Sequence, residues 1–152
     1  MAYDATLDDA LSMGYLMHWG GRLLRRLVDR QLRPLGLSSA HLPVINALAV
    51  NKALSQKALA EIAAIEQPTM AATLARMARD GIVERRPDPA DRRSALLSLT
   101  PATKAKLPAI RRAVAAVNRD ALSGLPLDQR VLFRAQLETM IRAMDRRIAG
   151  DP

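Results

Sequence analysis

Cysteine is absent from the sequence, which excludes disulfides, thiolate zinc sites and thiol-based redox sensing. Aromatic residues make up only 3% of the 152 residues, whereas hydrophobic residues make up 49%. This aliphatic composition favours packed helices over a sheet sandwich. Long apolar runs are also missing, because none reaches the roughly 18 residues of a membrane span. The start of the chain, "MAYDATLDDA", is acidic and unlike a signal peptide. We therefore expect a cytoplasmic protein.

Catalytic and metal-binding groups are scarce as well. His18 and His41 are the only histidines, and neither belongs to an H-E-x-x-H pattern. The sequence has no glycine-rich phosphate loop. We therefore expect no enzymatic activity, no cofactor and no metal.

Positive charge is plentiful by contrast. The chain has 23 Lys and Arg against 15 Asp and Glu, for a formal net charge of +8 and a pI of about 11.0. Such a balance is compatible with attraction to nucleic acid or to an anionic membrane surface. Most of the excess lies after residue 100, so charge alone does not locate a binding site.

Two long amphipathic segments are expected at the ends of the chain. The first runs at helical spacing from Leu11 to the region of Leu32 and is interrupted at Pro34 and Gly36. The last third predicts two helices, the first capped by Thr100 and containing Pro108. The second carries an apolar stripe made of Leu137, Met140, Ile141, Met144 and Ile148.

The middle of the chain predicts three shorter helices. The first starts after Ser38 or Ser39 and has Pro43 in its first turn. The second spans Gln56–Ala63, with Ser55 as N-cap and with Leu59 and Ile62 turned inward. The third begins near Glu66, has Pro68 in its first turn, and ends before Gly81 at the C′ position. Its inward face carries Met70, Leu74 and Met77. Two short helices joined by a tight connection indicate a helix-turn-helix.

A hairpin follows directly. In "IVERRPDPADRRSALLSLT", two short apolar strands flank the tip "PDPADRR", and Ala95, Leu97 and Leu99 alternate with other positions. A two-stranded ribbon after a helix-turn-helix is a wing. The expected fold class is therefore mainly α with a small β-wing, and long helices at both ends.

The order of these elements and the motif "DPADRRSALLSLT" strongly resemble the MarR family of winged-helix transcriptional regulators, from about Leu11 to Ile148. The resemblance implies a single domain over residues 1–152, with residues 37–100 as the winged DNA-binding part. It implies that residues 7–34 and 101–149 form dimerisation helices, through which two copies interlock. Leu11 and the stripe from Leu137 to Ile148 are the expected dimer contacts.

The resemblance also makes Gln56–Ala63 the supporting helix and Glu66–Asp80 the recognition helix. Because the major groove admits one helix, side chains near that helix's N-terminus meet base edges. Gln67 can make a bidentate contact with adenine, and Thr69 can meet a phosphate or a thymine methyl; alternatively, both decorate a solvated helix start. The full set of expected DNA contacts is Ser55, Gln56, Lys57, Gln67, Pro68, Thr69, Ala71, Ala72, Arg76, Arg86, Asp91, Arg92 and Arg93.

The wing tip has two interpretations. Arg93 suits the narrow minor groove of A·T-rich DNA, and Asp91 can direct its guanidinium through a bidentate pair. The alternative is a surface salt bridge that contributes less than about 1 kcal/mol. The prolines shorten the conformational search of the tip, which favours the first interpretation.

Two positions depart from the family pattern. Ala71 and Ala72 occupy the middle of the recognition helix, where many members have a polar and a basic residue, so specificity is expected to rest more on DNA shape. Thr103 replaces the familiar glycine after the wing, which leaves the start of the next helix open.

The resemblance further implies a repressor that a small aromatic or phenolic ligand releases from a pseudo-palindromic operator. Tyr15, His18, Trp19 and Arg22 form a candidate ligand site in the first helix, because His18 and Arg22 share a helix face. Alternatively, Trp19 packs in the dimer core and His18 satisfies a backbone carbonyl. A rival function is a winged-helix protein-interaction module with weak or no specific DNA binding.

Overall fold

The computed structural model describes residues 9–89 and 95–150, and only the backbone of residues 9–12. Its helices are α1 (Asp9–Leu32), α2 (Leu42–Asn51), α3 (Gln56–Ala63), α4 (Gln67–Arg79), α5 (Pro101–Ala121) and α6 (Leu127–Ala149). Its strands are β1 (Ala53–Ser55), β2 (Val83–Pro87) and β3 (Ala95–Leu99). Two 3₁₀ turns, η1 (Arg33–Leu35) and η2 (Ser39–His41), connect α1 to α2. This confirms the expected fold class, mainly helical with a small β-wing.

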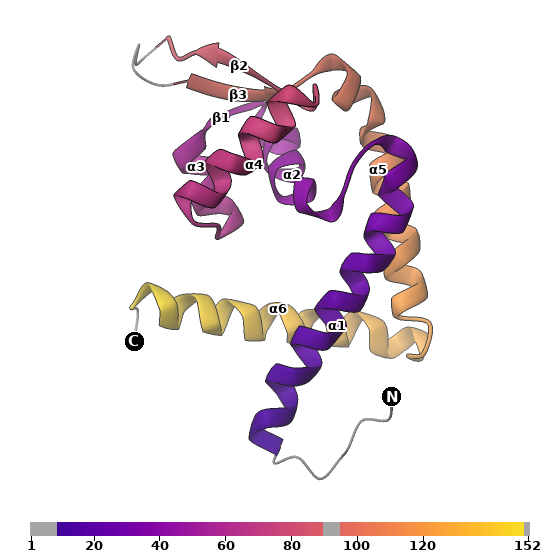
Figure 1. Ribbon diagram of the computed structural model, residues 1–152. Helices are drawn as coiled ribbons and strands as arrows, with labels where there is room; N and C mark the ends of the chain where they lie inside the picture. The colour runs from indigo at the N-terminus through magenta and orange to yellow at the C-terminus, as the bar shows by residue number, and fades with distance from the viewer. Residues whose placement is uncertain (1–8, 90–94, 151–152) are drawn as a thin grey trace. The chain divides into compact units, whose positions relative to one another are not determined.

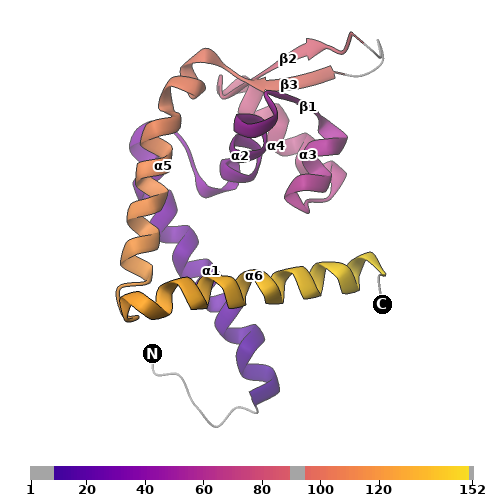
Figure 2. The same cartoon turned by 180° about the vertical axis from the view of Figure 1, so that it is seen from behind.

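The chain divides into two compact units, the first up to Ala115 and the second from Ala116 onward. The first contains α1, the winged-helix elements and most of α5, and the second contains the end of α5 and α6. Within the first unit, α2, α3 and α4 lie on one side of the sheet in both views (Figure 1, Figure 2). The core lies between those helices and the sheet. Its most deeply buried side chains are Leu32, Val44, Ile45, Leu59, Met70, Leu74, Met77, Leu97 and Leu99.

The predicted two-stranded ribbon is confirmed by the antiparallel pair of β2 and β3, and β1 adds a third strand to give the sheet order β1-β3-β2. Strand β1 pairs with β3 in the register Ala53↔Ser98, and β2 pairs with β3 in the register Val83↔Leu99. A three-residue strand is too short to show alternation, and its partner lies more than 40 residues away. The third strand therefore left no local signal in the sequence.

Helix boundaries follow the capping residues closely. The Ser55 side chain accepts a hydrogen bond from the Ala58 N–H at 3.2 Å, as expected of an N-cap. Gly81 follows α4 with φ +69, a left-handed conformation that glycine adopts without strain. The expected inward orientation of Ile62 was wrong, because that side chain is 57% exposed while Leu59 is fully buried. On this eight-residue helix, Leu59 and Ala60 form the buried face.

Two threonines secure the start of α5. The Thr100 Oγ1 accepts from the Thr103 N–H at 3.2 Å and donates to the Gly81 carbonyl at 2.8 Å. The Thr103 side chain is buried, with its hydroxyl 3.0 Å from that of Thr100. The helix begins at Pro101 in spite of the missing glycine, because the paired hydroxyls satisfy its first turn and tie it to the end of α4.

The connection from α1 to α2 is held by side chains that accept backbone hydrogen bonds. Asp29 Oδ1 accepts from the Ser39 N–H at 2.6 Å, and this bond lowers the pKa of Asp29. His41 Nδ1 accepts from the Ser38 N–H at 3.2 Å. Partial burial is the main cause that lowers the pKa of His41. The positive charge of Arg76 lowers this pKa further, whereas the negative charges of Asp80 and Asp29 raise it.

The His41 environment predicts a pH-dependent stability. Because burial lowers the folded-state pKa of His41, the unfolded chain binds more protons below about pH 6.5, and the free energy of unfolding falls as pH falls. Protonation also removes the acceptor for the Ser38 N–H. His41→Asn should lose this component of the slope, and His18→Asn should keep it. Urea unfolding between about pH 7.5 and pH 5.5, at fixed protein concentration, measures the slope. Identical slopes for all three proteins would contradict the assignment.

Candidate nucleic-acid interface

Helices α3 and α4 form the helix-turn-helix that the sequence predicts. Ala64 joins them in a left-handed conformation with φ +50, which ends α3 abruptly. Glu66 is the N-cap of α4, and Pro68 lies in its first turn. Backbone N–H groups in the first turn have no carbonyl partner within the helix, so proline, which lacks an N–H, costs no hydrogen bond there. The tight connection positions α4 across α3 within the first unit.

The outer face of α4 is determined by its inner face. Met70, Leu74 and Met77 are fully buried at i, i+4 and i+7. The remaining predicted contacts consequently face outward, and all are exposed except the half-buried Ala71. They are Gln67, Pro68, Thr69, Ala71, Ala72 and Arg76.

The chemistry along this face is uneven. Gln67 and Thr69 place hydrogen-bonding groups at the N-terminal end, and Arg76 places a guanidinium two turns later. Ala71 and Ala72, with their short methyl side chains, make the middle of this face flat and apolar. The face can therefore approach a smooth surface closely in the middle, and it can form hydrogen bonds at its two ends.

Arg79 belongs to the same face but was missed from the sequence. It lies seven residues after Ala72, and its side chain is 72% exposed. The helical period was the signal that could have found it. Its guanidinium Nε lies 3.3 Å from Asp80 Oδ1, so part of its charge is compensated.

The predicted contacts before and within α3 differ in accessibility. The Ser55 hydroxyl is used as the helix cap, and Gln56 is half-buried. Lys57 is exposed, with its Nζ 4.0 Å from Glu61 Oε1. Of the three, only Lys57 carries a charge, which Glu61 partly compensates.

The wing presents one predicted contact within the described residues. Arg86 Nη2 donates to Glu84 Oε1 at 2.8 Å, and the Arg86 side chain is 72% exposed. The other predicted wing residues, Asp91, Arg92 and Arg93, lie outside the described residues.

Comparison with known proteins agrees with this architecture. The model of the MarR family matches residues 35–94, which span the whole winged-helix segment up to the wing. A mutant MarR from E. coli, solved in complex with operator DNA, superposes with a TM-score of 0.80 at 21% identity, covering 90% of this chain and 99% of that chain. A probable transcriptional regulator from Pseudomonas aeruginosa superposes with a TM-score of 0.78 at 25% identity, covering 84% of this chain and 96% of that one.

Residues 35–94 therefore match the MarR family, and the fold of the chain is that of MarR structures. A third MarR-like structure is BpsR of Bordetella bronchiseptica, with a TM-score of 0.75 at 24% identity, covering 85% of this chain and 98% of that chain. That structure was described together with the regulation of BpsR's DNA binding by 6-hydroxynicotinic acid.

The predicted ligand cluster of this chain lies along α1. The rings of Tyr15 and Trp19 are 6.1 Å apart between centroids and tilted by 34°. Tyr15, His18 and Arg22 are exposed, and Trp19 is half-buried. The four side chains thus form an accessible aromatic and basic surface.

The described part of the chain contains neither a metal-binding cluster nor a membrane-spanning helix. No group of three or more His, Asp or Glu side chains in residues 9–89 and 95–150 is arranged to hold a metal ion. None of the helices in the same residues is long and apolar enough to cross a membrane.

Arg76 and Arg79 offer a matched pair for testing the α4 surface. We predict that Arg76→Ala weakens binding to duplex DNA and reduces the dependence of log K on log salt concentration by about one, the value for one lost phosphate contact. Arg79→Ala should have a smaller effect, because Asp80 already compensates its charge. Fluorescence anisotropy over a salt series measures both. Equal losses would mean that the two arginines act only as diffuse charge.

Proposed function

We propose that this protein is a sequence-specific transcriptional regulator that binds duplex DNA as a homodimer, acting as a repressor that a small aromatic or phenolic ligand releases. One observation carries the proposal. The exposed face of α4 is held by a fully buried inner face beside a wing, in a fold that a relative uses with operator DNA.

The outer face of α4 suits the major groove of B-DNA, whose width admits one helix. Gln67 in the first turn is placed to pair with the N6 and N7 atoms of adenine. Thr69 and Arg76 are placed to meet a thymine methyl or phosphate oxygens. Lys57 on α3 adds a phosphate contact on the same side of the helix-turn-helix.

Ala71 and Ala72 limit direct readout in the middle of α4. Specificity then depends on the shape and deformability of the DNA, which proteins read at positions they do not touch. The proposed wing contact serves this purpose, with Arg93 in a narrow minor groove and Asp91 directing it. Arg86 forms an ion pair with Glu84 nearer the base of the ribbon. It would therefore contribute to DNA affinity without regard to the base sequence.

Exposed apolar surface supports the homodimer. On α1, the exposed large apolar side chains are Met13, Tyr15, Leu16, Met17, Leu23, Leu24 and Leu27. On α6, no side chain is buried, and the predicted stripe is half-buried at Leu137 and Met140 and exposed at Ile141, Met144 and Ile148. Exposed apolar surface of this extent on a helix marks an interface. A second copy of the same chain is the proposed partner.

The ligand part of the proposal rests on the α1 cluster. Tyr15 and Trp19 supply aromatic surface, and His18 and Arg22 are placed to meet a carboxylate or phenolate. Regulation of BpsR's DNA binding by 6-hydroxynicotinic acid supports a ligand of this chemical class. Such a ligand acts only if it binds the DNA-free arrangement of the dimer more tightly than the DNA-bound one.

A second candidate function is a winged-helix module that pairs with another protein. The apolar middle of the α4 face, formed by Ala71 and Ala72, favours it. The two functions differ in salt dependence, because phosphate contacts weaken steeply as salt rises.

The proposed function is tested by selecting bound fragments from genomic DNA and measuring their affinity over a salt series. We expect a pseudo-palindromic site with half-sites about 10 base pairs apart, and a steep loss of affinity with salt. Arg93→Ala should weaken binding and flatten any preference for flanking A·T pairs, more than Arg86→Ala does. No enriched sequence and a flat salt series would favour the protein-interaction module.

The homodimer is tested by sedimentation at micromolar concentration. We expect a species of twice the 16.6 kDa chain mass. Ile141→Glu should shift it to monomer or to aggregates, because a carboxylate on the α6 stripe cannot be buried without a partner. Val50→Glu is the control, since Val50 is 81% exposed and belongs to α2, which carries neither of the two apolar surfaces. A native protein that sediments as a monomer without aggregating would contradict the proposed homodimer.

A further inference from the structure

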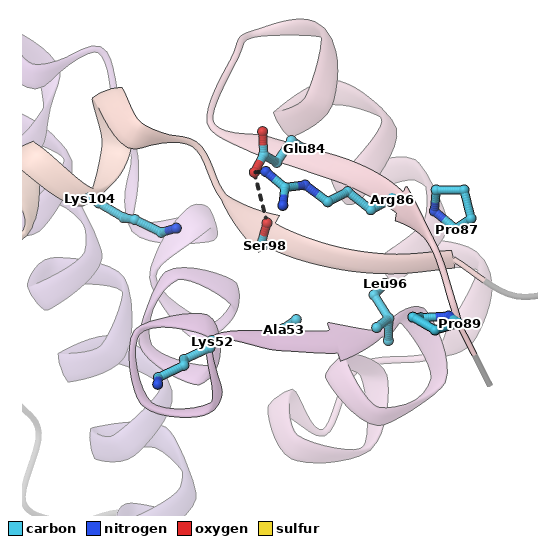
Figure 3. A pocket seen from close by; sticks show the side chains of 9 residues that line it. All are labelled: Lys52, Ala53, Glu84, Arg86, Pro87, Pro89, Leu96, Ser98 and Lys104. Atoms are coloured by element: carbon cyan, nitrogen blue, oxygen red, sulfur yellow. Dashed lines mark hydrogen bonds and ion pairs between the residues drawn. The ribbon is translucent and has the colours of Figure 1, made fainter. Parts of the chain in front are cut away.

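Two neighbouring hollows lie at the base of the wing, away from the outer face of α4. One has a volume of about 320 Å³ and lies over the sheet between β1, β2 and β3, as Figure 3 shows. The other has a volume of about 340 Å³ and lies between the end of α2, β3 and the start of α5. Lys52 and Lys104 line both, so the two hollows share two cationic side chains. Each volume is at the lower end of the range of small-molecule sites.

The charge of the first hollow favours an anion. Its lining contains three cationic side chains, Lys52, Lys104 and Arg86, and one carboxylate, Glu84. Glu84 Oε1 accepts from Arg86 Nη2 at 2.8 Å and from Ser98 Oγ at 3.1 Å, so its charge is compensated internally. Neither lysine forms an ion pair within the described residues. Two ammonium groups are therefore available to a ligand.

The rest of the lining is apolar. In Figure 3, Leu96 and Pro89 lie at the far side of the first hollow from the lysines. Leu48, Leu99 and Leu107 line the second hollow. A ligand that fills either hollow thus places an apolar body on aliphatic side chains while its charged end lies between the lysines.

The backbone of Lys52 adds an independent observation. Lys52 follows α2 with φ +62 and ψ −51, outside the regions that residues with a Cβ normally adopt. Glycine is the residue that suits such a conformation, and strained non-glycine residues cluster at functional sites. The chain nevertheless carries a lysine here, and its side chain lines both hollows.

We propose that the wing base is a second ligand site, separate from the α1 cluster, which binds a small amphipathic carboxylate between Lys52 and Lys104. Strands β2 and β3 and the start of α5 line the same space, so an occupant links the wing to α5. The site stands on its own lining and does not depend on the proposed DNA binding.

The test uses naphthalene-1-acetate as the probe and its uncharged amide as the matched control. Backbone amide NMR shifts of the DNA-free full-length protein are followed during titration. We expect naphthalene-1-acetate to shift the amides of Lys52, Ala53, Ser98 and Lys104. The amide analogue should bind about tenfold more weakly, because it cannot form a charged hydrogen bond with either ammonium group.

Three variants assign the effect to the lysines. Lys104→Gln, on a regular helix, should weaken probe binding about five- to tenfold, the lower end for a charge-assisted bond at an exposed site. Lys52→Gly should weaken it similarly without lowering the unfolding midpoint, because glycine relieves the positive φ. Arg112→Gln removes the same charge from an exposed position of α5 outside both hollows and should leave probe affinity unchanged.

Several outcomes would overturn the proposal. Equal affinity for the acid and the amide would mean that the lysines do not select charge. Shifts confined to α1 that disappear in Arg22→Ala would place the ligand at the α1 cluster alone. If Lys52→Gly and Lys104→Gln weaken duplex DNA binding but not probe binding, the two lysines serve DNA phosphates.

Discussion

The winged part of the molecule depends on the burial of three side chains, Met70, Leu74 and Met77. Each is fully buried, and removal of one such side chain to alanine costs about 2–5 kcal/mol, a large share of a domain's stability. Because these three residues lie on one stripe of α4, they also orient the opposite face. The hydrogen-bonding groups of Gln67 and Arg76 project outward because the opposite face of α4 is buried. Stability and the proposed recognition of DNA are therefore two consequences of one packing arrangement.

A second constraint connects that helix to the wing and to α5. The Thr100 hydroxyl donates to the Gly81 carbonyl directly after α4 and caps the first turn of α5. The Thr100 N–H donates to the Ile82 carbonyl at 3.2 Å, beside the first residue of β2. One residue thus fixes the end of α4, the base of the ribbon and the beginning of α5. Any ligand held at the wing base would act on this junction, because Lys104 lies one turn beyond it.

The long terminal helices present the opposite situation, since their apolar side chains find too few partners within one chain. Exposed leucines and methionines on α1, and the absence of buried residues on α6, leave surface that a soluble protein normally covers. In the proposed dimer this surface would hold two recognition helices at a defined spacing. Operator geometry would then be a property of the dimer, whereas base contacts would be a property of α4 alone.

Local sequence signals determined much of the fold, because caps and helical spacing act within a few residues. Ser55, Thr100, Gly81 and the 70/74/77 stripe indicated the helix ends and the inner face of α4, and the structure confirms each. The family followed from the same elements and the wing motif. Features that depend on residues far apart in the chain could not be predicted from local sequence signals. Strand β1 exists only because β3 pairs with it across more than 40 residues, and Ile62 is exposed because Leu59 and Ala60 form the face of α3 that meets the core. Likewise, the wing-base hollows bring together Lys52 and Lys104, which lie on separate elements. Only tertiary packing, in which long-range pairing decides what lies side by side, could place those two charges together.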